Sequence, residues 1–218
     1  MNALSIFKQP AIRILKLLDL YSLYLLKKAG PLYEDGWFRS YREQASIDAG
    51  GKPLPWITYP AIEFIKKRVI PGMSIFEYGS GGSTIWWANL VSHVVSVEHD
   101  REWFERLTAK ECANVDLFQI DLIYGGEYSK KIACYNNQFD IVVVDGRDRV
   151  NCIKNSLGAL TESGVVILDN SDRGQYAEGI AYLFEHGFRK IEFVGFTPIV
   201  NLKSETSIFY RSKNVFGI

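Results

Sequence analysis

From about residue 60 onward, short apolar runs alternate with segments of helical spacing. The apolar runs are rich in β-branched and aromatic residues and predict buried strands at 74–78, 93–98, 115–120, 139–144 and 164–168. The run at 139–144, FDIVVV, has the near-continuous apolar character of a strand covered on both faces. Segments with helical spacing separate the strands, at 60–67, 84 onward, 101–112, 151–160 and 175–186.

The last two predicted strands, 190–196 and 206–211, have no long helix between them, so they should form an antiparallel hairpin. Strands that alternate with helices should instead be parallel. The pattern therefore predicts an α/β fold, a Rossmann-like three-layer sandwich. Its mostly parallel seven-stranded sheet ends in an antiparallel C-terminal hairpin.

The N-terminal segment reads as a leucine-rich helix from Pro10 to about residue 28, stopped by Gly30 and Pro31. Charged residues interrupt its apolar run, which is far shorter than the roughly 20 residues of a spanning helix, so we expect no transmembrane segment. No small-residue cleavage site follows, which argues against a signal peptide. Three hypotheses remain: packing on the domain, a homodimer contact, or weak contact with a membrane surface. Packing or dimerisation is favoured, because apolar helix faces usually contact protein.

Residues 37–59 are aromatic and loop-like, and they precede the predicted domain. They could fold over a site as a lid or serve as a linker whose Trp56 and Tyr59 only pack. We therefore divide the chain into an N-terminal helical and aromatic extension, 1–59, and a main domain, 60–218.

Charge and cysteine content narrow the function classes. The 218 residues include 25 basic and 25 acidic side chains, so bulk charge gives no reason to expect nucleic acid as a partner. The cysteines at 112, 134 and 152 are widely spaced and lack a histidine cluster. A reduced, cytoplasmic location is expected, and a zinc site is not.

A glycine-rich turn joins the first predicted strand to the next helix. Glycines at 79, 81 and 82 leave no Cβ between backbone and ligand, and the helix start offers unpaired N–H groups. A dinucleotide fingerprint would need a third glycine in G-x-G-x-x-G, which is missing here. Glu77, just before the turn, would repel a pyrophosphate but could hold an ammonium group, directly or through water.

The sequence from Glu77 to Ser83, EYGSGGS, resembles motif I of class I S-adenosylmethionine-dependent methyltransferases, with Ser83 at the last glycine. Glu98 ends the second predicted strand, where a carboxylate can accept hydrogen bonds from ribose hydroxyls of either nucleoside cofactor. The resemblance also places Asp121 near an adenine amino group. The candidate cofactor residues are Glu77, Gly79, Ser80, Gly81, Glu98, Asp121 and Asp145.

Two further strand ends carry the candidate reactive groups. Asp145 follows the fourth predicted strand, and Asp169 and Asn170 follow the fifth, so their oxygens could together bind Mg²⁺. This resembles the metal site of catechol-type O-methyltransferases, which have a lysine base where this chain has Arg147 and Asp148. Arginine cannot act as a base. The candidate catalytic residues are Asp145, Asp148 and Asp169, and the candidate metal ligands are Asp145, Asp169 and Asn170.

An alternative is that Asp145 contacts cofactor or substrate without metal, and that Asp169 and Asn170 cap a helix. Arg147, Arg149 and Arg173 could receive an anionic substrate group or form surface salt bridges.

We therefore expect S-adenosylmethionine-dependent O-methylation of a small molecule or glycan precursor. An NAD-dependent oxidoreductase and a non-catalytic binding or scaffold protein are the competing hypotheses.

Overall fold

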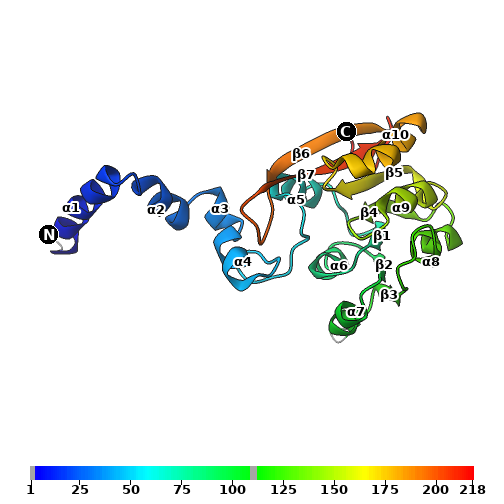
Figure 1. The fold of residues 1–218 in the computed structure, drawn as a ribbon, viewed down its shortest axis with the longest axis horizontal. Coiled ribbons are helices and arrows are strands. Elements are labelled where there is room, and N and C mark those ends of the chain that lie inside the picture. The colour runs from blue at the N-terminus through cyan, green and yellow to red at the C-terminus, as the bar shows by residue number, and fades with distance from the viewer. Residues whose placement is uncertain (1–2, 109–111) are drawn as a thin grey trace.

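A seven-stranded sheet forms the centre of the protein, and a helical arm leads away from it toward the N-terminus (Figure 1). The computed structural model describes residues 3–108 and 112–218. The strand order is β3-β2-β1-β4-β5-β7-β6. β7 runs antiparallel to both β5 and β6, and all other neighbouring strands are parallel. This confirms the predicted fold class. The strands are β1 (Ser74–Tyr78), β2 (His93–Glu98), β3 (Val115–Gln119), β4 (Phe139–Val144), β5 (Leu160–Asp169), β6 (Arg189–Phe196) and β7 (Lys203–Tyr210).

Helices cover both faces of the sheet, because side chains along each strand alternate between two apolar cores. Phe76 of β1 belongs to the core that includes Ile153 and Leu183, whereas its neighbour Ile75 belongs to the core that includes Ile62 and Trp87. The helices after the arm are α5 (Tyr59–Lys66), α6 (Gly82–Ala88), α7 (Arg101–Thr108), α8 (Glu127–Lys130), α9 (Arg149–Ser156) and α10 (Ala177–Glu185), with 3₁₀ turns η1 (Lys131–Cys134) and η2 (Gly174–Tyr176).

The direction of strand succession reverses between β1 and β4. From β1 the chain adds β2 and β3 on one side, then crosses to place β4 against the other side of β1. In open α/β sheets the crevice beyond the carboxyl ends of the strands at such a reversal is the usual ligand site. The glycine turn after β1 and Asp145 after β4 both lie at this point.

The predicted strands agree closely with the structure, and the predicted helices less so. β5 begins four residues earlier than the predicted 164, and its pairing with β4 shifts register between Phe139 and Ile141. The helix predicted at 151–160 runs from Arg149 to Ser156, because residues 157–159 form a turn and Leu160 already begins β5. Residues 109–111 of the predicted helix 101–112 lie outside the described part of the chain.

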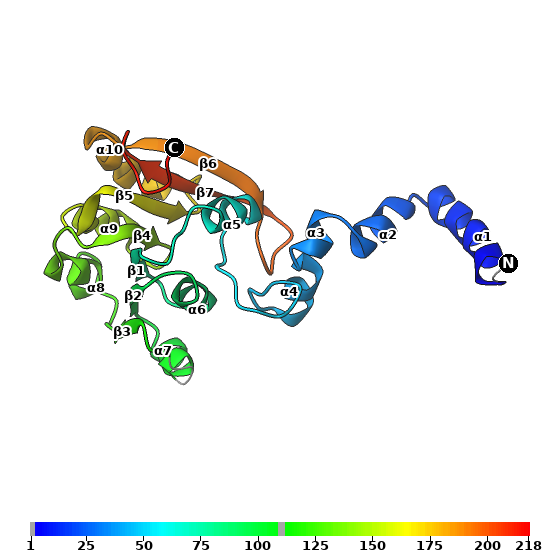
Figure 2. The ribbon, with the colours of Figure 1, turned by 180° about the vertical axis from the view of Figure 1, so that it is seen from behind.

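The N-terminal extension differs most from its prediction. The single helix expected from Pro10 to residue 28 is two helices, α1 (Ala3–Leu17) and α2 (Tyr21–Lys28), with Asp19 between them at a φ of 56°. Figures 1 and 2 show both reaching away from the sheet, and α2 buries no residue. Of the three hypotheses for this segment, packing on the domain therefore does not hold for α2. None of the described helices is both long and apolar enough to cross a membrane.

The remainder of the extension is attached to the domain. Residues predicted as loop include the helix α4 (Trp37–Glu43), which follows the short α3 (Pro31–Glu34). Trp37 Nε1 donates to the carbonyl of Val200 at 2.8 Å, and the Ile199 amide donates to Ser40 Oγ at 3.0 Å. These bonds fasten α4 to the loop of the C-terminal hairpin.

Candidate functional site

The glycine turn brings the ends of β1 and β4 into close contact. Gly79 has a φ of 93°, which favours glycine, and a Cβ added to it would lie 2.7 Å from Gly146 Cα. The two strand ends therefore approach at backbone distance. A hydrogen bond from the Asp145 amide to the Tyr78 carbonyl, at 3.1 Å, holds them together.

Glu77 lies buried beneath this turn. Its Oε2 accepts hydrogen bonds from Thr84 Oγ1 at 2.5 Å and from Ser96 Oγ at 2.8 Å. Thr84 Oγ1 in turn accepts the Gly81 amide at 2.9 Å, so the carboxylate fixes the turn through one hydroxyl. Among the described residues Glu77 Oε1 has no hydrogen-bond partner, and burial raises the pKa of Glu77 to about 7. The orphaned oxygen is where a donor from a ligand or water would be accommodated, and contact with an ammonium group stays a prediction.

Glu98, at the end of β2, is bonded to the same turn. Its Oε2 accepts the Ser80 amide at 2.9 Å and Ser80 Oγ at 3.1 Å. Its Oε1 accepts the amides of His99 and Asp100, both at 2.8 Å. A ribose hydroxyl donating to Glu98 would therefore share Oε2 with Ser80, and the ribose contact remains a prediction.

Trp103 is a site residue that the sequence reasoning missed. From α7 its Nε1 donates to the Ser80 carbonyl at 2.7 Å, and its side chain stays 44% exposed beside Gly81. The available signal was the pair Trp103 and Phe104 in the first turn of an otherwise mostly polar helix that begins three residues after Glu98. An exposed indole at the edge of a glycine turn offers a flat apolar surface to a ligand.

Asp121 lies on the exposed loop after β3, at the far side of Glu98. Its Oδ1 accepts the Gln119 Nε2 at 2.9 Å. Ile123 and Tyr124 on the same loop expose 68% and 71% of their surface. The loop is thus open to a ligand, and an adenine contact for Asp121 remains a prediction.

Arg149 joins the ends of β4 and β5. Its guanidinium donates to Asp145 Oδ1 at 2.9 Å and to the Asp145 carbonyl at 2.7 Å, and it also bonds the Asp169 carbonyl. Its Nε donates to the Gly146 carbonyl at 3.0 Å. Because Arg149 is buried and bonded to these acceptors, it is neither the anion receptor nor the surface partner that the sequence suggested.

Asp145 and Asp169 differ in how much of their side chains is exposed to solvent. The Asp145 side chain is 24% exposed, whereas Asp169 is 3% exposed and accepts Thr206 Oγ1 at 2.7 Å. Burial and the nearby Asp169 raise the pKa of Asp145 well above its usual value, against the pull of Arg149. Burial also raises the pKa of Asp169. Of the two, Asp145 is the group that a substrate can reach.

The same edge does not fit the predicted magnesium site. A guanidinium already bonds Asp145, and Asn170, at a φ of 52°, turns its amide to Ser204 Oγ at 3.0 Å. Within residues 3–108 and 112–218 no group of three His, Cys, Asp or Glu side chains could hold a metal ion. Because Arg149 already bonds Asp145 and the Asn170 amide bonds Ser204, we derive no step through a metal.

Asp148, the candidate base, makes local hydrogen bonds with both of its carboxylate oxygens. It has a φ of 50°, and its Oδ2 accepts the Gly125 amide at 2.7 Å. Its Oδ1 accepts Asn151 Nδ2 at 2.8 Å. The buried carboxylate thus ties the loop after β3 to the start of α9, and both of its oxygens are engaged.

The segment at 46–54 lies directly on the glycine turn. A bridge pairs Ile47 with Pro53, and the Leu54 amide donates to the Ser46 carbonyl at 2.9 Å. A Cβ on Gly82 would lie 3.1 Å from the Leu54 carbonyl oxygen. Of the two hypotheses for this region, the position over the start of α6 favours the lid.

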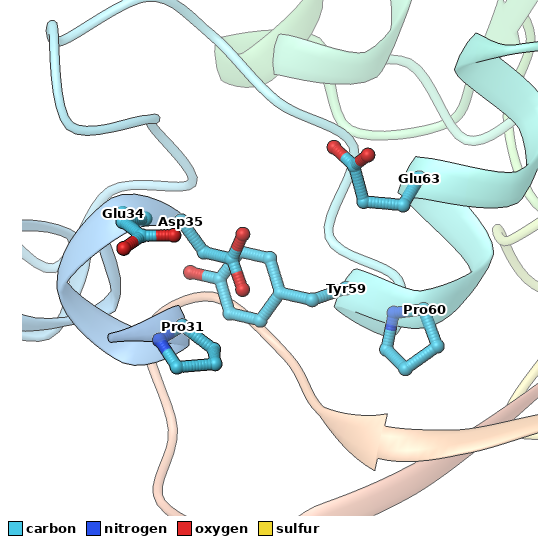
Figure 3. Close-up of a pocket in the computed structure, with 6 residues that line it drawn as sticks. All are labelled: Pro31, Glu34, Asp35, Tyr59, Pro60 and Glu63. Carbon is cyan, nitrogen blue, oxygen red and sulfur yellow. The ribbon is translucent and has the colours of Figure 1, made fainter.

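A hollow of about 520 Å³ opens between α3 and α5 (Figure 3). Carboxylates face it from both sides, and burial together with Glu63 and Glu34 raises the pKa of Asp35. The adjacent Thr58 amide donates to Thr206 Oγ1 at 3.1 Å, and Thr206 donates to Asp169. Tyr59, which lines the hollow, therefore directly follows a residue that is bonded to the β5 end of the site through Thr206. Its lining is Pro31, Glu34, Asp35, Tyr59, Pro60 and Glu63.

Comparison with known proteins identifies the fold. No model of a known protein family matches the sequence, and no curated protein does. A methyltransferase-like protein from Silicibacter pomeroyi superimposes with a TM-score of 0.52 and 23% identity, over 72% of this chain and 89% of the other. The precorrin-6y C5,15-methyltransferase from Geobacter metallireducens gives 0.55 and 14%, over 70% and 87%. Aeropyrum pernix fibrillarin, solved with natively bound S-adenosyl-L-methionine, gives 0.51 and 14%, over 65% and 68%.

The chain has the fold of class I S-adenosylmethionine-dependent methyltransferases, as the resemblance around Glu77 implied. The names of these neighbours specify no common substrate, so the fold alone does not identify an acceptor.

Proposed function

We propose that this protein is an S-adenosylmethionine-dependent methyltransferase that acts on a hydroxyl group of a small molecule or glycan precursor. The observation that carries the proposal is the Glu77–Thr84–Gly81 network, which holds a glycine turn open at the reversal of the sheet. Glu98 and the exposed Trp103 both bond the main chain of Ser80 in that turn.

The residues present fit the cofactor. Within the described part of the chain, Glu77 keeps one buried oxygen without a hydrogen-bond partner beneath the turn, and Ser80 and Glu98 present polar atoms at its rim. When bound, S-adenosylmethionine supplies an electrophilic methyl group on a sulfonium. The protein then needs mainly to align an acceptor and to take up its proton.

Asp145 is our candidate for the proton acceptor. Its raised pKa makes its ionised form a stronger base than an ordinary carboxylate, and its side chain is partly exposed at the end of β4. Arg149 keeps it oriented through Oδ1. Asp169 helps to position Arg149 through its main-chain carbonyl. The segment at 46–54 would exclude water from the turn.

The NAD hypothesis has less support. A pyrophosphate at the start of α6 would lie near the carboxylate of Glu77, and the third glycine of the fingerprint is absent. A measurement of methyl transfer, rather than the geometry of the site, would distinguish an enzyme from a non-catalytic binding or scaffold protein.

Calorimetric titration with S-adenosylhomocysteine and with NAD⁺ tests the proposal. We expect binding of the homocysteine compound only, weakened on the order of tenfold in Glu98→Ala, because the turn loses its anchor. Glu105→Ala, which removes an exposed carboxylate from α7, is the matched control and should bind as wild type. Preference for NAD⁺, or no binding of the homocysteine compound, would refute the assignment.

A second experiment addresses the reactive side. Asp145→Asn should leave affinity for S-adenosylhomocysteine nearly unchanged while lowering methyl transfer on the order of 100-fold, since a positioned base contributes about that much. An unchanged rate of methyl transfer would mean that a group other than Asp145 takes up the proton.

A further inference from the structure

The arm formed by α1 and α2 exposes more apolar surface than a soluble helix normally does. Leu17 is 86% exposed, Leu23 59% and Leu25 46%. Soluble proteins rarely expose a contiguous apolar patch of this kind unless it meets a partner or a membrane. The large apolar side chains exposed on the arm are Ile14, Leu17, Leu18, Leu20, Leu23, Tyr24, Leu25 and Leu26.

Charge on the arm is segregated from charge on the domain. Residues 1–30 hold five of the 25 basic residues of the chain and one of its 25 acidic residues, Asp19. Residues 31–218 consequently hold 20 basic and 24 acidic residues. A chain with no net charge thus has a positive arm and a negative body. The basic residues of the arm are Lys8, Arg13, Lys16, Lys27 and Lys28.

We infer that the arm docks on an anionic lipid surface and lies along it. A helix that is apolar on one side and basic on the other binds the interface of a bilayer, and its affinity rises with anionic lipid. In α1, Lys16 lies on roughly the opposite side of the helix from Ile14, whereas Arg13 lies one turn before Leu17 on the same side. In α2 the two lysines end a helix that is otherwise apolar around most of its circumference.

A second copy of the chain fits the arm less well. Two arms side by side would bring together two segments of the same positive charge, which repel each other in a low-dielectric contact. Helix pairing also uses a narrow apolar stripe, whereas α2 is apolar on nearly all sides. Tyr21 and Tyr24 add rings of the type that favours the headgroup region.

Flotation of the full-length protein with lipid vesicles tests the inference. We expect binding to vesicles of phosphatidylcholine with phosphatidylglycerol, weakening as salt rises, and little binding to phosphatidylcholine alone. Lys27→Ala with Lys28→Ala should reduce the partition coefficient about fivefold per lysine. Leu17→Ser with Leu23→Ser should reduce it on the order of tenfold per leucine, because each loses an apolar side chain that would be buried in lipid.

Controls separate the arm from the domain. Lys66→Ala with Lys213→Ala makes the same charge change on the exposed body and should leave partitioning nearly unchanged. Melting temperature should be equal in all variants, since α2 buries nothing on the domain. Equal binding to both vesicle types would overturn the inference. So would a failure to float together with a sedimenting dimer that the leucine substitutions abolish.

Discussion

Gly79 and Gly146 face each other across the ends of β1 and β4, so closely that a Cβ on Gly79 would lie 2.7 Å from Gly146 Cα and 2.8 Å from its amide nitrogen. Backbone atoms cannot move aside as a flexible side chain can. The contact therefore requires glycine at residue 79, and it holds the glycine turn against the loop that carries Asp145.

Gly79→Ala should destabilise the protein by at least about 2 kcal/mol, since alanine is disfavoured at a φ of 93° and its Cβ would meet backbone. The measurement is urea unfolding followed by circular dichroism. Gly72→Ala is the matched control, because Gly72 has open space around it in the turn before β1. Equal unfolding midpoints for the two variants would show that the close approach of Gly79 to Gly146 does not require glycine at residue 79.

Glu77→Gln should change how stability depends on pH. In the folded protein burial raises the pKa of Glu77 from 4.5 to about 7. The stability due to its neutral form is therefore complete below pH 4.5 and is lost as pH rises to about 7. The variant should lack this loss, so its stability relative to wild type should improve by about 3 kcal/mol between pH 4.5 and 7.5. Unfolding in urea at several pH values measures it, and parallel curves for the two proteins would contradict it.

Thr84→Val should break the connection between the Gly81 amide and the Glu77 carboxylate while keeping the shape of the side chain. Two buried polar groups would lose a partner, so we expect about 1–3 kcal/mol of destabilisation and weaker binding of S-adenosylhomocysteine. Calorimetry and thermal melting measure the two effects. Thr84→Ser keeps the hydroxyl and should largely restore both. If serine is as harmful as valine, the methyl group rather than the hydroxyl is what matters.

Arg149→Met should destabilise the protein by about 3–5 kcal/mol, because Asp145 and the carbonyls at the ends of β4 and β5 would lose a buried cation. Arg147→Met removes an exposed arginine two residues away, and its stability should stay within about 0.5 kcal/mol of wild type. Guanidinium unfolding compares them. Similar losses of stability in both variants would mean that the hydrogen bonds of Arg149 do not stabilise the folded protein.

Local pattern was enough to predict the sheet. The runs at 74–78, 93–98 and 139–144 match β1, β2 and β4 residue for residue, because a strand buried on both faces must be apolar at successive positions. The glycine turn could also be predicted, because the glycines that form it are close together in the sequence. The break at Asp19 was missed because only one residue leaves the helical conformation, and aspartate tolerates a positive φ without other sequence signals.

The site was harder to predict because its groups are assembled from distant parts of the chain. The donor to Asp169 is Thr206 on β7, and the donor to Thr206 is the amide of Thr58. Sequence spacing could place Asp145 and Asp169 at one edge, but it could not show that Arg149 lies between the strand ends. Asp148 lies close to where the catechol-type O-methyltransferases have a lysine base, but it is a different type of residue. In the structure its local bonds to Gly125 and Asn151 hold it.

The place of β7 in the sheet has a consequence for biosynthesis. β7 is the last strand made, yet it lies between β5 and β6, so the ribosome must complete residues 203–210 before either strand has its final neighbour. Until then β5 presents an open edge of Val166, Ile167 and Leu168, which can pair with other nascent chains. Premature termination or slow translation near residue 200 should therefore yield aggregates rather than a trimmed, folded protein.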